Sequence, residues 1–196
     1  MSILDVRLER KALLDRRLRR CHACPGMNVR GVTDAVPAFG NVLSPVVILG
    51  QSPCVSSAEK GIPFSGEAGG KLDKVFLRAG VKKADLFILN ATNCHPEGNR
   101  KATEEETENC RPYVMEYVKL VKPKLIVCLG SDAQAVIFGR TFRASQPVVS
   151  LWPGFKVAAL GVYHPAYFLH QHDKEQEEEW ADTLAAVIRR YWRKRG

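Results

Sequence analysis

The sequence predicts an α/β fold, a three-layer α/β/α sandwich with a central, mainly parallel four-stranded sheet. Four short apolar runs are continuous rather than alternating, as in strands that helices cover on both faces. Helical stretches separate these runs, and strands that alternate with helices form parallel sheets through crossover connections. No repeat or low-complexity linker divides the 196 residues, so we expect a single domain over residues 1–196.

The first predicted element is a helix over residues 4–20, within an N-terminal segment 1–20 that leads into a pair of cysteines. Four leucines, Leu4, Leu8, Leu14 and Leu18, lie on or near one face of this helix, and arginines occupy the other faces. Two interpretations follow from this pattern. Either the leucines dock the helix and leave a solvated basic face, or the basic face contacts a nucleic acid.

Four strands and four further helices are then predicted in alternation. The strands are the apolar runs at 46–50, 85–90, 124–130 and 156–164. The helices are expected at about 67–79, 103–121, 131–139 and 174–193. Because the carboxyl ends of parallel strands share one edge of a sheet, the segments that follow the strands should converge on one crevice. These segments are Gly50-Gln51-Ser52-Pro53-Cys54, Asn90, Gly130-Ser131 and His164-Pro165-Ala166.

The composition is that of a basic globular protein. Hydrophobic residues make up 45% of the chain, and no apolar run approaches the roughly 20 residues that span a bilayer, so we expect no membrane partner. The N-terminus lacks the apolar block and cleavage site of a secretory signal, so we expect a cytoplasmic protein, nucleoid-associated if it is bacterial or viral. The net charge of +8 fits a polyanionic partner.

Four of the six cysteines form a pattern typical of a metal site. Cys21 and Cys24 make a C-x2-C pair, and Cys94 and Cys110 flank a polar stretch that contains glycine. In a reducing compartment paired cysteines indicate metal binding more than disulfides. Four thiolates suit either an iron–sulfur cluster or a structural zinc ion, and ligand count alone does not separate the two. Cys128 lies inside a predicted strand and is expected to behave as a small hydrophobic residue.

An ordered set of segments resembles the uracil-DNA glycosylase superfamily, and specifically its family 4 members, which carry a [4Fe–4S] cluster. The resemblance covers roughly residues 20–190. The segments are Cys21-x2-Cys24, the loop 50–54, Gly61-Ile-Pro-Phe-Ser-Gly-Glu-Ala-Gly69, Asn90 with Cys94, Gly98-Asn-Arg100, Cys110-Arg-Pro, Pro123-Lys-Leu-Ile-Val-Cys-Leu-Gly130 and Tyr163-His-Pro-Ala-Tyr-Phe-Leu169.

The resemblance implies a monofunctional DNA repair glycosylase. Such an enzyme hydrolyses the N-glycosidic bond of uracil, or of a related deaminated base, and leaves an abasic site and the free base. Its partner is DNA that contains a damaged base, and we expect it to act as a monomer. The resemblance also implies that Cys21, Cys24, Cys94 and Cys110 bind a [4Fe–4S] cluster, with zinc as the alternative. We expect this cluster to be structural, because hydrolysis moves no net electrons.

Three residues match the base pocket of the family. Enzymes that act on a base in duplex DNA flip it out of the stack and hold it in a fitted pocket. Phe64 matches the residue that stacks on the base, and Asn90 matches the residue that reads its edge through an amide. His164 matches the residue that donates a hydrogen bond to the charge developing on the departing base. The nearby glycines Gly61, Gly66 and Gly69 are expected to let the backbone approach a ligand closely.

Other matched residues are expected to contact DNA. Ser131 follows a strand and is predicted to bind a backbone phosphate. Phe168 and Leu169 are predicted to act as wedges that fill the gap left by the flipped base. Arg100, near Lys101 and Arg111, is expected to lie close to the DNA backbone.

One position departs from the family pattern. Family 4 members read Gly-Glu-Ala-Pro-Gly where this chain reads Gly50-Gln51-Ser52-Pro53-Cys54, so Gln51 replaces the catalytic glutamate. Ser52 and Cys54 stay as predicted base-binding residues. We expect reduced activity in which Gln51 orients the water, or in which a neighbouring acid, Glu59 or Glu67, substitutes. The alternative is a non-catalytic member of the superfamily that binds DNA or senses damage.

Overall fold

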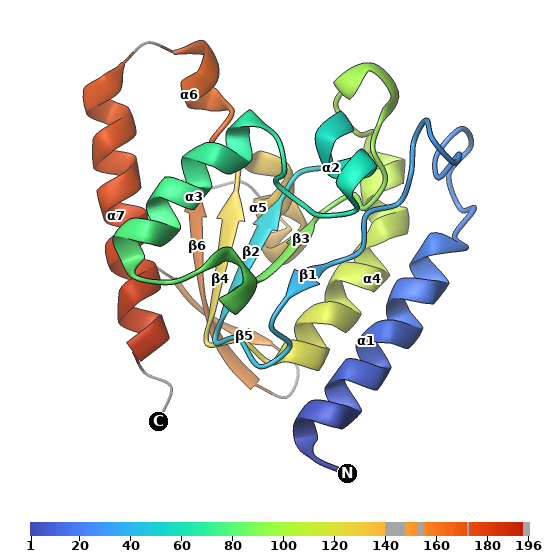
Figure 1. Ribbon diagram of the computed structural model, residues 1–196, viewed down its shortest axis with the longest axis horizontal. Coiled ribbons are helices and arrows are strands. Elements are labelled where there is room, and N and C mark those ends of the chain that lie inside the picture. Colours follow the sequence, from blue (N-terminus) through green and yellow to red (C-terminus); the bar gives the residue numbers. More distant parts are fainter. Residues whose placement is uncertain (140–147, 153–154, 172, 194–196) are drawn as a thin grey trace.

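The computed structural model describes residues 1–139, 148–152, 155–171 and 173–193, and it has three layers (Figure 1). A single six-stranded sheet forms the middle layer, in the order β1-β3-β2-β4-β6-β5. Its inner strands are parallel, and each edge strand is antiparallel to its neighbour. The strands are β1 (Phe39–Gly40), β2 (Val46–Gly50), β3 (Phe87–Asn90), β4 (Leu125–Leu129), β5 (Val148–Trp152) and β6 (Phe155–Val162).

The α/β class and the four predicted strands are confirmed, but the predicted number of strands is wrong. The four apolar runs form β2, β3, β4 and β6, which are the parallel strands of the sheet. The sequence interpretation missed the edge strands β1 and β5. A two-residue strand such as β1 carries no periodicity, and β5 pairs with β6 as an antiparallel partner that needs no crossover helix.

Helices cover both faces of the sheet. The helices are α1 (Ile3–Arg19), α2 (Val55–Lys60), α3 (Glu67–Ala79), α4 (Glu104–Val121), α5 (Ser131–Phe138), α6 (Tyr167–His170) and α7 (Lys174–Arg193), with short 3-10 turns at Lys83–Asp85 and Glu97–Asn99. Among the described residues, no helix is long and apolar enough to span a bilayer.

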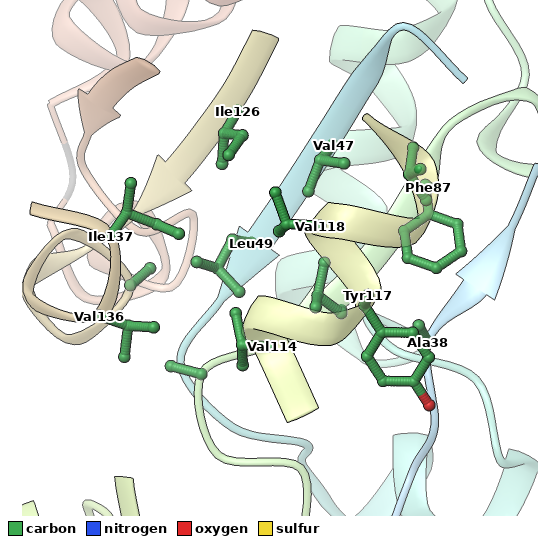
Figure 2. Close-up of a cluster of buried hydrophobic side chains, with 14 of the residues drawn as sticks. Ala38, Val47, Leu49, Phe87, Val114, Tyr117, Val118, Ile126, Val136 and Ile137 are labelled. Carbon is green, nitrogen blue, oxygen red and sulfur yellow. The ribbon is translucent and has the colours of Figure 1, made fainter. Parts of the chain in front are cut away.

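Alternation along each strand sends neighbouring side chains to opposite faces and builds two cores. On one face, Val47 and Leu49 of β2 pack with Tyr117 and Val118 of α4 (Figure 2). On the other face, Val46 and Ile48 pack against residues of α3 and α7. The buried strands therefore form a rigid platform whose carboxyl ends position the loops.

Helix α1 docks on α4 and keeps much of its basic surface outside. Leu14 and Leu18 are buried, whereas Leu4 and Leu8 are 39% and 49% exposed, so the predicted four-leucine face is only half correct. Arg7 donates to the carbonyls of Val42 and Val121, which ties the helix to two other elements at once. The helix therefore docks through its carboxyl-terminal half and one half-buried arginine.

Candidate active site

The segments that follow β2 and β6, together with the starts of α2 and α3, line one cleft of about 670 Å³. The cleft lies at the carboxyl edge of the parallel strands, where β3 and β4 flank β2 on opposite sides. Six of the predicted site residues line it: Gln51, Ser52, Cys54, Phe64, His164 and Leu169. The convergence predicted from the sequence is therefore real for the loops after β2 and β6.

Phe64 forms an aromatic wall of this cleft and has an unusual backbone. Its φ is +55°, a conformation that is uncommon for a bulky residue outside functional sites. Two neighbours hold it there. The ammonium of Lys83 donates to the carbonyl of Phe64, and Gly69 passes so close that a Cβ on it would lie 1.9 Å from that oxygen. Gly69 is thus needed for the turn at Phe64, and it also lines the cleft, where its predicted close approach to a ligand stays a prediction.

Asn90 lies beside the Phe64 ring, across the backbone of Gly50. A Cβ at position 50 would lie 2.3 Å from Cζ of Phe64 and 2.5 Å from Oδ1 of Asn90. The Asn90 side chain is 1% exposed, and its Nδ2 has no hydrogen-bond partner among the described residues. A buried donor without a partner costs about 1–3 kcal/mol. This donor therefore marks a place where a bound molecule would complete the hydrogen bonding.

Replacing Gly50 by alanine is expected to close this pocket. The new methyl group would displace the Phe64 ring or the Asn90 amide, because neither can keep its position at 2.3–2.5 Å. We expect ligand binding in the cleft to fall at least about tenfold, since overpacking of this kind costs about 1–3 kcal/mol. Binding by the Gly50→Ala variant is to be compared with that of Gly70→Ala, where the structure has open space. Equal losses in both variants would contradict the pocket described here.

His164 faces the Phe64 ring, with 5.9 Å between the ring centroids. The backbone N–H of Ala166 donates to Nδ1 of His164 at 3.2 Å, so the proton of a neutral ring lies on Nε2. Burial lowers the pKa of His164 to about 4, against an opposing effect of Asp132. The imidazole is therefore neutral at pH 7 and carries one N–H that is free to donate to a ligand.

The loop after β2 brings Gln51, Ser52 and Cys54 to the cleft without a carboxylate. Cys54 is the N-cap residue directly before α2, and its Sγ lies 3.4 Å from Oγ of Ser57. Ser57 also accepts from the backbone N–H of Ser65, so it connects α2 to the segment beside Phe64. The residues of this loop thus shape the wall of the cleft, and Gln51 contributes an uncharged amide.

Comparison with known proteins identifies the family. The model of the uracil DNA glycosylase superfamily matches residues 37–188, which is most of the chain. The chain belongs to the uracil-DNA glycosylase superfamily. Three curated relatives are named type-4 uracil-DNA glycosylases. The one from Archaeoglobus fulgidus is 31% identical and covers 84% of this chain and 85% of the relative. Those from Pyrobaculum aerophilum and Thermotoga maritima are 33% and 29% identical, over 79% and 86% of this chain and 82% and 88% of the relatives.

Phe168 and Arg100, both predicted to contact DNA, are engaged by other side chains of this superfamily member. Phe168 is 3% exposed and packs against Trp180 with 5.0 Å between ring centroids, an arrangement that favours a core role over the predicted wedge role. Its neighbour Leu169 is half-buried and lines the cleft, in a position that suits the same role. Arg100 donates to both carboxylate oxygens of Glu106, at 2.9 and 2.6 Å, and its side chain stays 45% exposed.

Ser131 is the first residue of α5, and it lies outside the lining of the cleft. Its hydroxyl donates to Asp132 at 3.2 Å.

Sequence reasoning also missed two contributors to the site of this glycosylase-superfamily protein. The contact of Lys83 with the carbonyl of Phe64 has no local signal, because 19 residues separate the two. The glycine at position 50, directly at a strand end, was a signal that close packing would occur there.

The four cysteines of the predicted metal site gather at the amino-terminal side of α4. Cys94 and Cys110 are buried, Cys21 and Cys24 are half-buried, and all four are free thiols. Burial first, and the neighbouring cysteines second, raise the pKa of Cys94 to about 12. Among the described residues, no three His, Cys, Asp or Glu side chains are placed so that they would hold a metal ion. The donor chemistry of these four thiols fits a four-thiolate group.

Proposed function

We propose that this protein is a DNA repair glycosylase that hydrolyses the N-glycosidic bond of uracil, or of a related deaminated base, in DNA. One observation carries the proposal. Phe64 and His164 line the cleft with an aromatic face and a neutral imidazole donor, and beside the Phe64 ring lies the buried amide of Asn90 with a free donor. These are the three groups that a flipped imide base requires. The names of the type-4 relatives support the same reaction.

The reaction assigned to these residues starts with the base flipped into the cleft. The base stacks on Phe64, and its edge pairs with the amide of Asn90, which offers one acceptor and two donors. When the C1′–N1 bond breaks, the electron pair leaves with the base. Nε2–H of His164 then donates to the oxygen that carries the developing negative charge, which lowers the barrier. A neutral donor suits this role because it keeps its proton while it stabilises the anion.

The second half of the reaction adds water to the sugar. Gln51 lines the cleft and is proposed to orient this water through its amide. An amide does not accept the proton of the water as a carboxylate would, and general-base assistance is worth about 10²–10⁴ in rate. The rate of this protein is therefore expected to lie below that of relatives that carry glutamate at this position.

We also propose that Cys21, Cys24, Cys94 and Cys110 bind a [4Fe–4S] cluster, with zinc as the alternative. When bound, this group would supply structural cross-linking and no chemistry for the hydrolysis. The four thiolates would join the segment after α1, the segment after β3 and helix α4, which closes long loops of the chain. Such a cross-link would hold the stretch between Cys94 and Cys110, which contains Asn99 at the edge of the cleft.

The test of the proposed reaction is a base-release assay on a single-uracil oligonucleotide, single-stranded and duplex. Alkaline cleavage converts each abasic site into a strand break that a gel resolves. We expect breaks at the uracil position and none in a matched oligonucleotide with thymine there. The absence of product at stoichiometric protein on both substrates would contradict the proposal.

A second function is favoured by Gln51 alone. A member of the superfamily with an intact pocket and no carboxylate on the loop after β2 would bind a flipped base without releasing it. Salt-sensitive binding of uracil-containing DNA with no base release, in the same assay, would favour this non-catalytic function.

A further inference from the structure

The cleft contains one carboxylate among its described lining residues, and it belongs to Glu67. Glu67 is the first residue of α3 and follows directly on the segment that carries Phe64. No hydrogen bond or ion pair engages it among the described residues, and its side chain is exposed. An acidic residue in the first turn of a helix is common for structural reasons alone. Because Glu67 also lines the cleft, its carboxylate is placed where it could take part in catalysis.

The other two nearby acids, Glu59 and Asp132, do not place a carboxylate in the cleft. Glu59 is exposed on α2 and does not line the cleft. Asp132 lines a separate groove beside α4, and its Oδ1 lies 3.0 Å from the ammonium of Lys101. Oδ1 of Asp132 is therefore already paired. Its Oδ2 is buried without a hydrogen-bond partner among the described residues, and Asp132 acts to raise the pKa of His164, but Asp132 does not line the cleft. Among the described lining residues, only Glu67 brings a carboxylate into the cleft that lacks one at Gln51.

Glu67 is exposed whereas the base-binding groups are buried, and this difference places its carboxylate on the side of the sugar. Of the two groups that would bind the base, Phe64 lines the cleft and is 8% exposed, whereas Asn90 is 1% exposed and lies beside the Phe64 ring, outside the lining. A base held by both groups would therefore lie on the interior side of the cleft. A flipped nucleotide stays attached to the DNA backbone, which means that its sugar must remain near the mouth. An exposed carboxylate in the lining of the cleft lies at that mouth.

We propose that Glu67 is a catalytic residue that replaces the missing glutamate of the loop after β2; this inference rests on the glycosylase function proposed above. Its carboxylate stabilises the positive charge that develops on the sugar and accepts a proton from the attacking water. The water oxygen bonds to C1′, the C1′–N1 bond breaks, and the electron pair departs with the base. The proton on Glu67 then passes through solvent to the base anion, so that the products are an abasic sugar and the neutral base.

Single-turnover rates of uracil release test this assignment in five proteins: the wild type, Glu67→Gln, Glu59→Gln, Gln51→Glu and the double variant Gln51→Glu/Glu67→Gln. We expect Glu67→Gln to lower the rate about 10²-fold or more, with unchanged or tighter DNA binding and an unchanged melting temperature. Glu59→Gln should stay within about twofold of the wild type, because Glu59 does not line the cleft. The double variant should regain most of the lost rate, since it returns a carboxylate to the loop after β2.

A wild-type rate in Glu67→Gln would overturn the assignment of Glu67 and leave the glycosylase function standing. A loss that comes with an equal loss of folding or DNA binding, and that Gln51→Glu does not restore, would also overturn it. A wild-type protein that releases no uracil would overturn both the glycosylase function and the role of Glu67.

Discussion

The His164→Ala variant should release uracil about 10²–10³ times more slowly than the wild type in single turnover. The substitution removes Nε2–H, the ring N–H with which His164 can donate to a ligand, because Nδ1 of the same ring already accepts from the backbone N–H of Ala166. Binding of uracil-containing DNA should change far less, since the donor acts on charge that develops only as the bond breaks. The rate of base release and the dissociation constant, measured on the same oligonucleotide, separate the two effects.

The matched control is His170→Ala, because His170 also lines the cleft but is exposed and has no place in the reaction. Its rate should stay within about threefold of the wild type. Equal losses in His164→Ala and His170→Ala would contradict the role of His164. So would a wild-type rate in His164→Ala.

The lowered pKa of His164 makes predictions about how the rate of base release and the free energy of unfolding change with pH. Since the folded pKa is about 4, the rate of the wild type should show no inflection near the ordinary histidine pKa of 6.5. The unfolded chain binds this proton first as pH falls, so His164 lowers the free energy of unfolding between pH 6.5 and pH 4. Denaturant titrations over that range should show a smaller loss of stability in His164→Ala. The same slope in both proteins would contradict a half-buried imidazole that stays neutral.

Replacing Cys94 by alanine should remove the bound metal and destabilise the protein by about 5 kcal/mol or more. Metal binding by a structural thiolate site contributes directly to the free energy of folding, and a three-cysteine remnant loses most of that contribution. Wild-type protein purified without oxygen should show a broad visible absorption band and contain iron, and Cys94→Ala should show neither. Chemical denaturation measures the accompanying loss of stability.

Cys54→Ala is the control for the spectrum, because Cys54 is a free thiol beside Ser57 in the cleft and no predicted ligand. It should keep both the band and the iron. Stoichiometric zinc in a colourless wild-type protein would replace the cluster by the alternative ion. A wild-type protein without either metal, as stable as Cys94→Ala, would contradict a four-thiolate site.

The parallel core could be predicted from the sequence because its strands are buried on both faces. Residues 46–50 and 125–129 are apolar without alternation, and in a chain with intervening helices this pattern is typical of strands inside a parallel sheet. The edge strand β1 escaped prediction because two residues that pair with β3 carry too little local information. A strand that helices cover on both faces can be predicted from its apolar composition. Whether an edge segment forms a strand depends instead on its pairing with a neighbouring strand.

The site shows the same division. The places of Asn90 and His164 could be predicted because Asn90 ends β3 and His164 follows the end of β6 by two residues, and the carboxyl ends of these parallel strands share one edge of the sheet. Phe168 could not, because whether an aromatic residue points toward DNA or into the core depends on Trp180, which lies on another helix. The contact between Lys83 and Phe64 is likewise a product of tertiary packing, with no pattern in the sequence.

The most direct test of the proposed function is to follow uracil release in water labelled with oxygen-18 by mass spectrometry. Hydrolysis at C1′ predicts free unlabelled uracil and one labelled oxygen on each abasic sugar. Both products should form together in wild-type protein and fall together in His164→Ala. No free uracil at stoichiometric protein, or label on the base instead of the sugar, would contradict the hydrolysis proposed for this cleft.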